Sequence, residues 1–598
     1  MTYSYIGKMA AYERDRQGVS AETVCKGLCD LDIYNSFEKG EDVGDIHVVR
    51  MVLQRLGISA SLAGRYLCRD EYDEIYARFN ILELLRAGRL VSAKKAVEEY
   101  ENRYCVRGNR LNMQFMTYMN ARIAQLDGDT VEALCMYKKA IGYTIEDYGM
   151  AEFTCISVYE YFMLANIARL NAVLGNYMEA EKLYERLLAY CHRRNPDCWT
   201  MACVYPKTVC EMLDINSPDS MGIYERRVWL EECNAAIKAL CDTSRLHYIC
   251  PLLRKRHALL ELLGEAPDRQ WDGFLEHYEW LRNKYHIKGE LLEWYPYYNS
   301  DWEFYPVEKL INERRKLYGM TIEELAEGVC TSETVSRIIN RKVSPKRSTV
   351  EALLGKLGLR GVLAEDVIVS DDWNVHRIWK NMVQCQAVDD YITTKKLYTK
   401  LNNRLDLSIP INKKVSEYKN IEIEMGGCGN DYKKYACEHE KILGFPIESI
   451  RSLTILTRIE EMIINRYFYC MDKVKDYTKF EAFEDMCSKY MGSLSRAFAC
   501  EIESSLVRCA NFIGNEGKFA VSNKYSELGI MLELDCERLY CLSSFLYCIP
   551  WNNAESGKRV SDDDVKMCEC AYWMAWMLKE KGRMNLYNCW LQKHRDMV

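Results

Sequence analysis

Residues 308–359 decide the fold of this chain, and they read EKLINERRKLYGMTIEELAEGVCTSETVSRIINRKVSPKRSTVEALLGKLGL. Apolar residues recur at helical spacing along this stretch and predict four short helices around one small core. Gly319 ends the first helix, and Thr321 with Glu324 three residues later forms a capping box that starts the second. The stretch therefore predicts a small all-α domain.

A short turn joins the second and third helices of this stretch. We expect the second helix at 322–329 and the third at about 332–340, with Cys330 and Thr331 as the turn. Two helices joined so tightly, the later one with a polar outer face, are what a helix-turn-helix needs to lay a recognition helix in the DNA major groove. The residues expected to contact double-stranded DNA are Thr321, Thr331, Ser332, Glu333, Thr334, Arg337, Asn340, Arg341, Lys342, Lys346 and Arg347.

The stretch is basic inside an acidic chain. Lys and Arg occur eleven times and Glu seven times in residues 308–360, whereas the whole chain has a net charge of -7 and an isoelectric point near 5.9. Any nucleic-acid contact must therefore be local, with the cations that follow the third helix placed to meet phosphates. A four-helix unit that touches only protein is the alternative.

Residues 321–345, TIEELAEGVCTSETVSRIINRKVSP, resemble the XRE-type, lambda-repressor-like helix-turn-helix. The resemblance implies that the third helix reads DNA. The chain departs from the family pattern at Ile322, where the family often has Gln, and at 339–341, where Ile-Asn-Arg stands in place of Glu-Asn-Gly.

Composition favours a helical protein. The 598 residues are enough for about four domains, and only 11 Pro and 32 Gly with 48% hydrophobic residues favour long helices with short connections. The 27 Cys are scattered without a Cys-x-x-Cys pair, so we expect small buried apolar residues of a reduced cytoplasm and no metal site.

Two further expectations come from motifs that the sequence lacks. There is no Gly-rich phosphate loop and no nucleophile motif, so we expect neither a cofactor nor enzyme activity. The first residues have no apolar signal segment and no run of about 18 apolar residues follows. We therefore expect a cytoplasmic protein without a membrane span.

The N-terminus repeats the pattern of the deciding stretch. Residues 6–58 align with 307–359 without a gap at a shift of 301 positions, so that Gly18 meets Gly319. The outer face of the first copy carries carboxylates where the second carries cations, with seven Lys and Arg against nine Asp and Glu overall. Carboxylates repel phosphates, so we expect the first copy to keep the fold without DNA affinity, and packing on a partner is the alternative role.

The same shift continues beyond the small domains. Lys94-Lys95 fall on Lys395-Lys396, and Asn102-Arg103 fall on Asn403-Arg404. The chain therefore has the pattern of two tandem modules of about 300 residues. The expected domains are a degenerate helix-turn-helix at 1–60, tetratricopeptide-like (TPR-like) helical repeats at 61–300, the XRE-type domain at 301–362, and degenerate TPR-like repeats with C-terminal helices at 363–598.

Three segments of the first half share one spacing from Gly to Ala. They are 88–93, 128–133 and 175–180, and each lies between two apolar helices. A Gly where the chain turns and a small Ala where two helices pack closely are the needs of a tetratricopeptide hairpin. Spacings near 40 residues rather than 34 indicate lengthened helices or loops. An α-solenoid is therefore predicted.

The second half carries a weaker form of this signal. Turns are expected at 389–391 and 430–432 without the Gly-to-Ala spacing, and a break at 548–553 precedes a C-terminal helical pair. The aromatic linker 295–306 between the halves is expected to pack rather than swing.

An XRE-type domain followed by TPR-like repeats resembles the RRNPP group, the peptide-responsive quorum-sensing regulators of Gram-positive bacteria. The resemblance implies that the repeats bind a short peptide or protein ligand and that binding repositions the DNA-reading domains of a homodimer. It places ligand contacts about six and nine residues before each turn Gly, which gives Arg122, Asn166 and Arg169 as peptide-binding candidates. Surface charge on amphipathic helices is the alternative role of these residues.

Two arrangements and two function classes stay open. We expect two chains to pair, because one helix-turn-helix on a single half-site binds weakly, and an intrachain pseudo-dimer of the two halves is the alternative. We expect a transcription regulator, and the alternative is a TPR-type interaction scaffold in which the helix-turn-helix domains are only structural.

Overall fold

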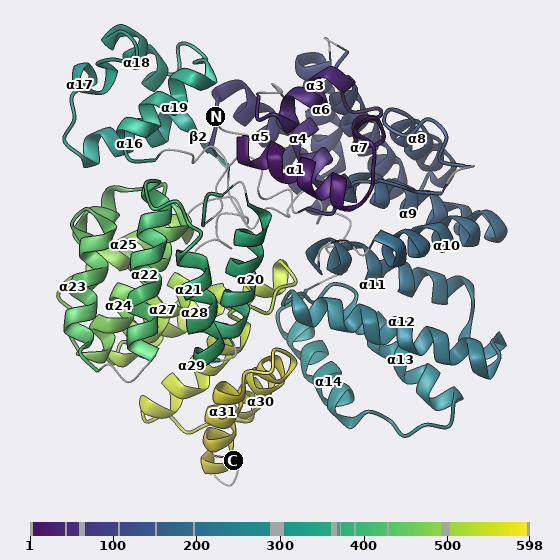
Figure 1. The fold of residues 1–598 in the computed structure, drawn as a ribbon. Coiled ribbons are helices and arrows are strands. Elements are labelled where there is room, and N and C mark those ends of the chain that lie inside the picture. Colours follow the sequence, from purple (N-terminus) through teal and green to yellow (C-terminus); the bar gives the residue numbers. More distant parts are fainter. Residues whose placement is uncertain are drawn as a thin grey trace.

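The structure is a computed structural model that is helical almost throughout, which confirms the predicted all-α class (Figure 1). In the part of the chain that it describes, the strands are two short ones, β1 (Tyr66–Leu67) and β2 (Tyr305–Pro306). The described residues are 4–41, 45–58, 66–105, 108–149, 152–194, 196, 198–287, 304–359, 367–370, 372–387, 390–426, 430–491 and 503–594.

The predicted domain boundaries near residues 60, 300 and 362 lie outside these described residues, as does most of the linker 295–306. Of that linker, only residues 304–306 are described, and they are buried.

Two four-helix units have matching elements. The first unit comprises α1 (Ser4–Arg16), α2 (Ala21–Cys25), α3 (Leu31–Glu38) and α4 (Ile46–Arg55), and the second unit comprises α16 (Val307–Leu317), α17 (Ile322–Ala326), α18 (Ser332–Ile339) and α19 (Arg347–Lys356). The prediction of α17 to residue 329 was wrong, because Gly328 adopts a left-handed φ of 73° and ends the helical turn early. Gly27 does the same in the first unit, with a φ of 76°.

Pairs of antiparallel helices build the first helical array, residues 69–284. The expected turns at Gly88, Gly128 and Gly175 are confirmed, because each Gly adopts a left-handed φ between two helices. The Ala that follows each turn is fully buried, as close packing of a helix pair requires. The array contains α5 (Arg69–Arg86), α6 (Leu90–Tyr100), η2 (Glu101–Cys105), α7 (Arg110–Leu126), α8 (Thr130–Gly142), α9 (Val158–Val173), α10 (Tyr177–Arg194), α11 (Cys198–Ile215), η3 (Pro218–Ser220), α12 (Ile223–Asp242), α13 (Ile249–Leu262) and α14 (Arg269–Lys284).

In the second helical array, residues 373–594, an Asp stands before the helix at both turns that were expected near 389–391 and 430–432. Asp390 and Asp431 cap α21 and α23 by accepting hydrogen bonds from backbone N–H groups three residues later. The predicted break at 548–553 was wrong, because α29 runs through it with Pro550 inside the helix. The array contains α20 (Trp373–Ala387), α21 (Tyr391–Asn402), α22 (Pro410–Gly426), α23 (Tyr432–Leu443), η5 (Ile447–Ser452), α24 (Arg458–Lys473), α25 (Phe480–Met491), α27 (Glu503–Asn515), α28 (Phe519–Asp535), α29 (Leu542–Glu555), α30 (Asp562–Met577) and α31 (Lys581–His594).

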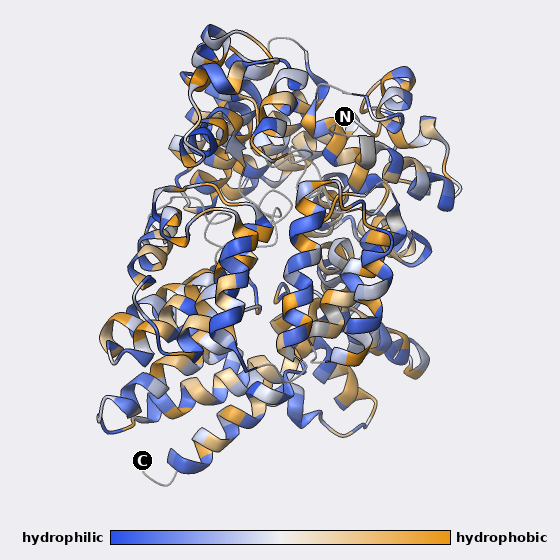
Figure 2. Ribbon diagram, turned by 60° about the vertical axis from the view of Figure 1, so that its left-hand side comes forward, coloured by the Kyte–Doolittle hydropathy of each residue, from blue (hydrophilic) through white to orange (hydrophobic). Residues whose placement is uncertain are grey.

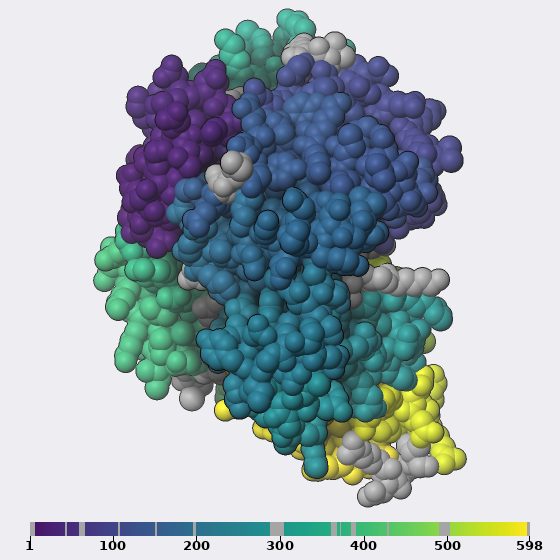
Figure 3. Space-filling view, turned by 90° about the vertical axis from the view of Figure 1, so that its right-hand side faces the viewer, coloured from purple at the N-terminus to yellow at the C-terminus, as the bar shows by residue number. Residues whose placement is uncertain are grey.

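The two arrays stand side by side and meet at their C-terminal ends (Figures 1 and 3). There the backbones of Arg245 and Arg538 form an antiparallel bridge, and α14 packs on α30. A Cβ added at Gly273 of α14 would lie 2.5 Å from the indole of Trp573, so the close approach of the two helices requires glycine. One hydrophobic core accordingly continues from α5–α14 into α28–α31.

Hydrophilic and hydrophobic residues are interspersed along most helices (Figure 2), as expected of helices that pack one side on a core. No helix among the described residues combines the length and the apolar composition that crossing a membrane requires.

Candidate nucleic-acid interface

The third helix of the second four-helix unit, α18, presents a polar face to solvent. Thr331 caps its N-terminus by accepting a hydrogen bond from the Thr334 N–H at 3.1 Å. Val335 and Ile338 are fully buried and fix the helix on the unit's core. The opposite side of α18 therefore points away from the protein, with Arg337 among its exposed residues.

The predicted DNA contacts differ in accessibility. Thr321 is exposed and caps α17 through a capping box with Glu324, as the sequence indicated. Ser332, Thr334 and Arg347 are only partly exposed. The exposed residues are Thr321, Thr331, Glu333, Arg337, Asn340, Arg341, Lys342 and Lys346.

Residues 311–361 match the family model HTH_3, described as Helix-turn-helix. This segment is an XRE-type helix-turn-helix. No curated protein matches the chain in sequence.

Several solved structures are similar to about half of the chain. PlcR of Bacillus thuringiensis, in complex with the peptide PapR7 and DNA, is 17% identical, with 48% of this chain and 98% of that chain covered and a TM-score of 0.30. ComR from S. thermophilus, in complex with DNA and its signalling peptide ComS, is 11% identical, with 48% and 99% covered and a TM-score of 0.30. The apo form of ComR from Streptococcus vestibularis is also 11% identical, with 47% and 96% covered and a TM-score of 0.30.

The loop after α18 of the helix-turn-helix rests on the N-terminus of α5. The Arg69 guanidinium donates to the Arg341 carbonyl at 2.5 Å, and the Ser344 hydroxyl donates to Asp70 at 2.9 Å. Arg347 donates to Glu71 at 2.6 Å and is thereby drawn away from solvent. This contact could not be predicted from local sequence patterns, because more than 270 residues separate the partners.

A buried ion pair anchors the helix-turn-helix to the second array. Arg314 of α16 is fully buried and donates to both oxygens of Glu460, at 2.9 and 2.6 Å. Burial opposes ionisation of this carboxyl, but Arg314, Lys414 and the Thr457 N–H outweigh it and lower the pKa of Glu460 to about 2. The charged pair therefore fixes how the helix-turn-helix sits on the second array.

The first four-helix unit is anchored at the matching place by a different helix. Arg55 of α4 donates to Glu160 of α9, and both side chains are buried. Ser157 and Glu160 form the capping box of α9, as Thr457 and Glu460 do for α24. Burial opposes ionisation here too, yet Arg55 lowers the pKa of Glu160.

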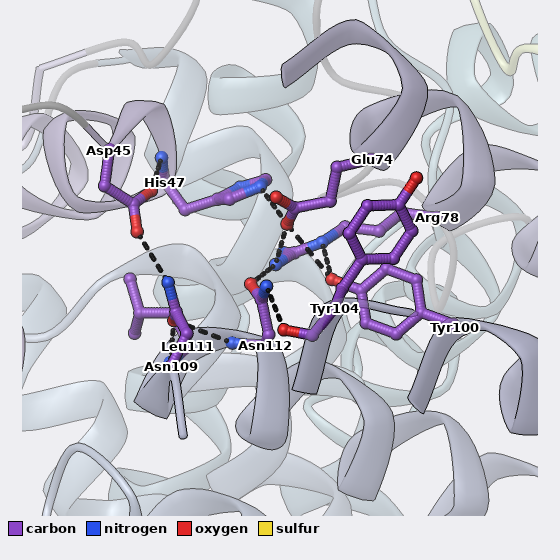
Figure 4. A network of polar contacts seen from close by, with 9 residues as sticks. All are labelled: Asp45, His47, Glu74, Arg78, Tyr100, Tyr104, Asn109, Leu111 and Asn112. Carbon is purple, nitrogen blue, oxygen red and sulfur yellow. Dashed lines mark hydrogen bonds and ion pairs between the residues drawn. The ribbon is translucent and has the colours of Figure 1, made fainter. Parts of the chain in front are cut away.

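A second polar network ties the first unit to the start of its array (Figure 4). His47 of α4 lies 2.9 Å from the Glu74 carboxylate, which also accepts from Arg78 at 3.0 Å. Arg78 donates in turn to Tyr100 at 2.8 Å and to Asn112 at 2.7 Å. Burial opposes ionisation of Glu74, but His47 and Arg78 outweigh it and hold its pKa well below the usual range.

Helix α3 of the first unit corresponds to α18 of the second, and acidic and apolar side chains lie at its start. Asp30, Leu31, Asp32 and Ile33 on α3 are all exposed. None of these four residues is a cation that could contact a phosphate. The absence of DNA affinity in this unit stays a prediction.

The residues expected to bind a peptide are more buried than a ready-made contact surface would be. Asn166 is fully buried, and its side-chain oxygen accepts from Arg169 at 3.2 Å. Arg122 is 2% exposed and donates to Gln125 at 2.8 Å. The structure thus joins two of the three candidates directly.

Two charged residues that the sequence did not single out complete this cluster. Lys207 of α11 lies 3.1 Å from Glu211, which lies 4.0 Å from Arg169 and accepts from Tyr184 at 2.9 Å. No Gly-to-Ala turn marks α11, so the repeat pattern could not point to it. Within the described ranges, no three His, Cys, Asp or Glu side chains are grouped to hold a metal ion.

Proposed function

We propose that the chain is a cytoplasmic, sequence-specific DNA-binding transcription regulator whose helical repeats sense a peptide or protein ligand. The observation that carries the proposal is the solvent-facing side of α18, which bears Arg337 and Asn340 on a helix fixed by a buried apolar core. The match of residues 311–361 to a helix-turn-helix family supports it.

Roles for the DNA-contacting residues follow from their places on the unit. Arg337 and Asn340, with Glu333, lie where side chains reach base edges. Lys342 and Lys346 flank the helix, where cations meet phosphates and set register. The full proposed set is Thr321, Thr331, Ser332, Glu333, Thr334, Arg337, Asn340, Arg341, Lys342, Lys346 and Arg347.

The ligand contacts are proposed at Arg122, Asn166 and Arg169. The Asn166 side-chain N–H group is buried and has no hydrogen-bond partner in the part of the chain that the structure describes, and a peptide carbonyl would satisfy it. Because Arg169 donates a hydrogen bond to the oxygen of this amide, a ligand that binds the amide would displace the guanidinium. This is the kind of local change that shifts a conformational equilibrium.

We further propose that the chain consists of two tandem modules, with domains at 1–60, 61–300, 301–362 and 363–598. Helices α7 and α22, like α9 and α24, have bounds that differ by 300 residues, which supports the duplication. The bridge between Arg245 and Arg538 already pairs the halves within one chain. A homodimer that presents two copies of the helix-turn-helix would therefore use another surface, and sedimentation showing a monomer at micromolar concentration would argue against it.

The test is selection from a randomised duplex DNA pool by the full chain and by the variant R337A/R341A/K342A. The wild type is expected to enrich one sequence, and the variant is expected to bind that duplex about tenfold more weakly and with a shallower salt dependence, because phosphate and base contacts are lost. Anisotropy titrations at several salt concentrations measure both quantities. The matched control K95A/K138A/K139A removes three exposed cations from α6 and α8.

An interaction scaffold is the second candidate, favoured by the exposed apolar residues Leu31 and Ile33 of the first unit. No enriched sequence, or equal weak binding by wild type and variant, would put this scaffold first and abandon the regulator.

Neutralising the N-terminus of α5 is expected to strengthen DNA binding. Asp70 accepts from Ser344 in the loop that follows α18, and Glu71 pairs with Arg347. Both carboxylates would repel a phosphate there, and Glu71 competes with it for Arg347. The variant D70N/E71Q should therefore bind the selected duplex about tenfold more tightly at low salt. Anisotropy measures this change, with E98Q/E99Q on the exposed side of α6 as control. Unchanged affinity would place this loop away from the DNA.

A further inference from the structure

The second array carries a different set of side chains where the first has its proposed ligand contacts. At the 300-residue offset between matching helices, Arg122, Asn166 and Arg169 correspond to Glu422, Arg466 and Tyr469.

Three cations surround one aromatic ring in this region. The Arg508 guanidinium lies 4.8 Å, the Arg466 guanidinium 5.5 Å and the Lys473 ammonium 5.3 Å from the centre of the Tyr469 ring. The ring attracts each cation, but the cations repel one another. An arrangement of this kind gains stability when an anion sits among them.

Carboxylates compensate only part of this charge. Glu422 lies 2.8 Å from Arg466 and is almost fully buried. Asp472 accepts from Asn515 at 3.0 Å and lies 3.7 Å from Lys475. Glu422 therefore compensates Arg466, whereas neither Arg508 nor Lys473 has an ion pair with a carboxylate among the described residues.

Arg508 has few protein partners. Its Nε group donates to the Asn465 side-chain oxygen at 3.4 Å, a long hydrogen bond. Among the residues that the structure describes, no carboxylate lies within 4.0 Å of Arg508, and its two terminal nitrogens make no hydrogen bond. Burial and, after it, the neighbouring Arg466 lower the pKa of Arg508, and the more distant attraction of Asp472 offsets only part of this effect.

We propose that Arg466, Arg508 and Lys473 form a binding site for an anionic ligand, through a carboxylate or phosphate group that the free edge of Arg508 holds in bidentate fashion. Glu422 keeps Arg466 oriented, and Tyr469 supports the guanidinium of Arg508. The two arrays then respond to different ligands, because the first array presents Asn166 and Arg169 at the matching positions. The site belongs to the second array and does not depend on whether the helix-turn-helix binds DNA.

The experiment uses the full chain and two small probes, inorganic phosphate and N-acetyl-leucine, in a chloride buffer of constant ionic strength. Broadening of the phosphate ³¹P signal and saturation transfer to the N-acetyl-leucine protons report binding. N-acetyl-leucinamide is the uncharged match of the carboxylate probe. R508Q removes the central cation, and K473Q removes an exposed one and leaves the packing of α24 intact. R451Q, an exposed cation in η5, is the control for charge.

Binding of at least one anionic probe to wild type and R451Q, weakened about fivefold or more in R508Q and K473Q, is expected. Phosphate binding alone would assign the site to phosphate groups, and N-acetyl-leucine binding without its amide would assign it to carboxylates. Equal signals for wild type, R508Q and K473Q, or no signal with either probe, would overturn the site. A loss of DNA selection would leave this result untouched, so the two proposals fail separately.

Discussion

Replacement of Glu460 by Ala is expected to lower the free energy of unfolding of the second array and its helix-turn-helix by about 3–5 kcal/mol. The change removes both carboxylate acceptors of the fully buried Arg314, whose hydrogen bond to the Ile455 carbonyl, at 3.1 Å, stays. It also removes half of the α24 capping box, which adds to the loss. Urea unfolding followed by circular dichroism measures the change.

Two comparisons make this result specific to the ion pair. E160A removes the matching partner of Arg55 in the first half and should cost a similar amount. E460Q keeps the shape and the capping hydrogen bond but not the charge, so it should cost less than E460A. A loss below about 1 kcal/mol for E460A would mean that Arg314 reaches water or another acceptor, and that the pair does not anchor the helix-turn-helix.

Local features of the fold were predictable from the sequence because their partners are close along the chain. The capping box of Thr321 and Glu324 spans three residues, and the turns at Gly88, Gly128 and Gly175 need only a residue that tolerates a left-handed φ. The same logic failed at Pro550, since burial of α29 between neighbouring helices outweighs the local tendency of proline to break a helix.

Contacts between distant segments were beyond prediction. Arg314 and Glu460 are 146 residues apart, and Arg347 lies 276 residues from Glu71. A basic side chain after a recognition helix indicates a phosphate contact. The neighbouring residues in the sequence do not show that a carboxylate from another helix pairs with this side chain. In the structure an ion pair with Glu71 holds Arg347, and the DNA contact expected of Arg347 stays a prediction.

The ligand candidates show a related limit. Helical spacing places Asn166 and Arg169 on one side of α9, and the structure brings them into contact. Helical spacing does not predict how deeply these side chains are buried. Their burial depends on the next helix pair, here α11 with Lys207 and Glu211. For the same reason the sequence did not predict the cations around Tyr469, because Arg466 lies on α24 and Arg508 on α27.

Replacement of Lys419 by Met is expected to raise the free energy of unfolding at pH 7, with an upper bound of about 3 kcal/mol. Lys419 of α22 is 3% exposed, and burial lowers its pKa to about 8, against the attraction of Glu422 and with the repulsion of Arg466. A pKa that is lower in the folded state than the ordinary value of 10.5 means that folding disfavours the charged lysine. Met removes this cost and fills a similar volume.

The pH dependence of unfolding tests independently whether the buried Lys419 destabilises the folded state. Below pH 8 the lysine is protonated in both states and the full cost is present, whereas above pH 10.5 it is neutral in both and the cost is gone. Between these values the unfolded state binds more protons, so the stability of the wild type rises with pH and the advantage of K419M shrinks. Urea unfolding at pH 7, 9 and 10 follows this change, with K413M on the exposed side of α22 as control. A K419M chain that is less stable than the wild type at pH 7 would show that the contacts of the ammonium with Trp379 and Tyr418, at 5.1 and 5.4 Å, outweigh its burial.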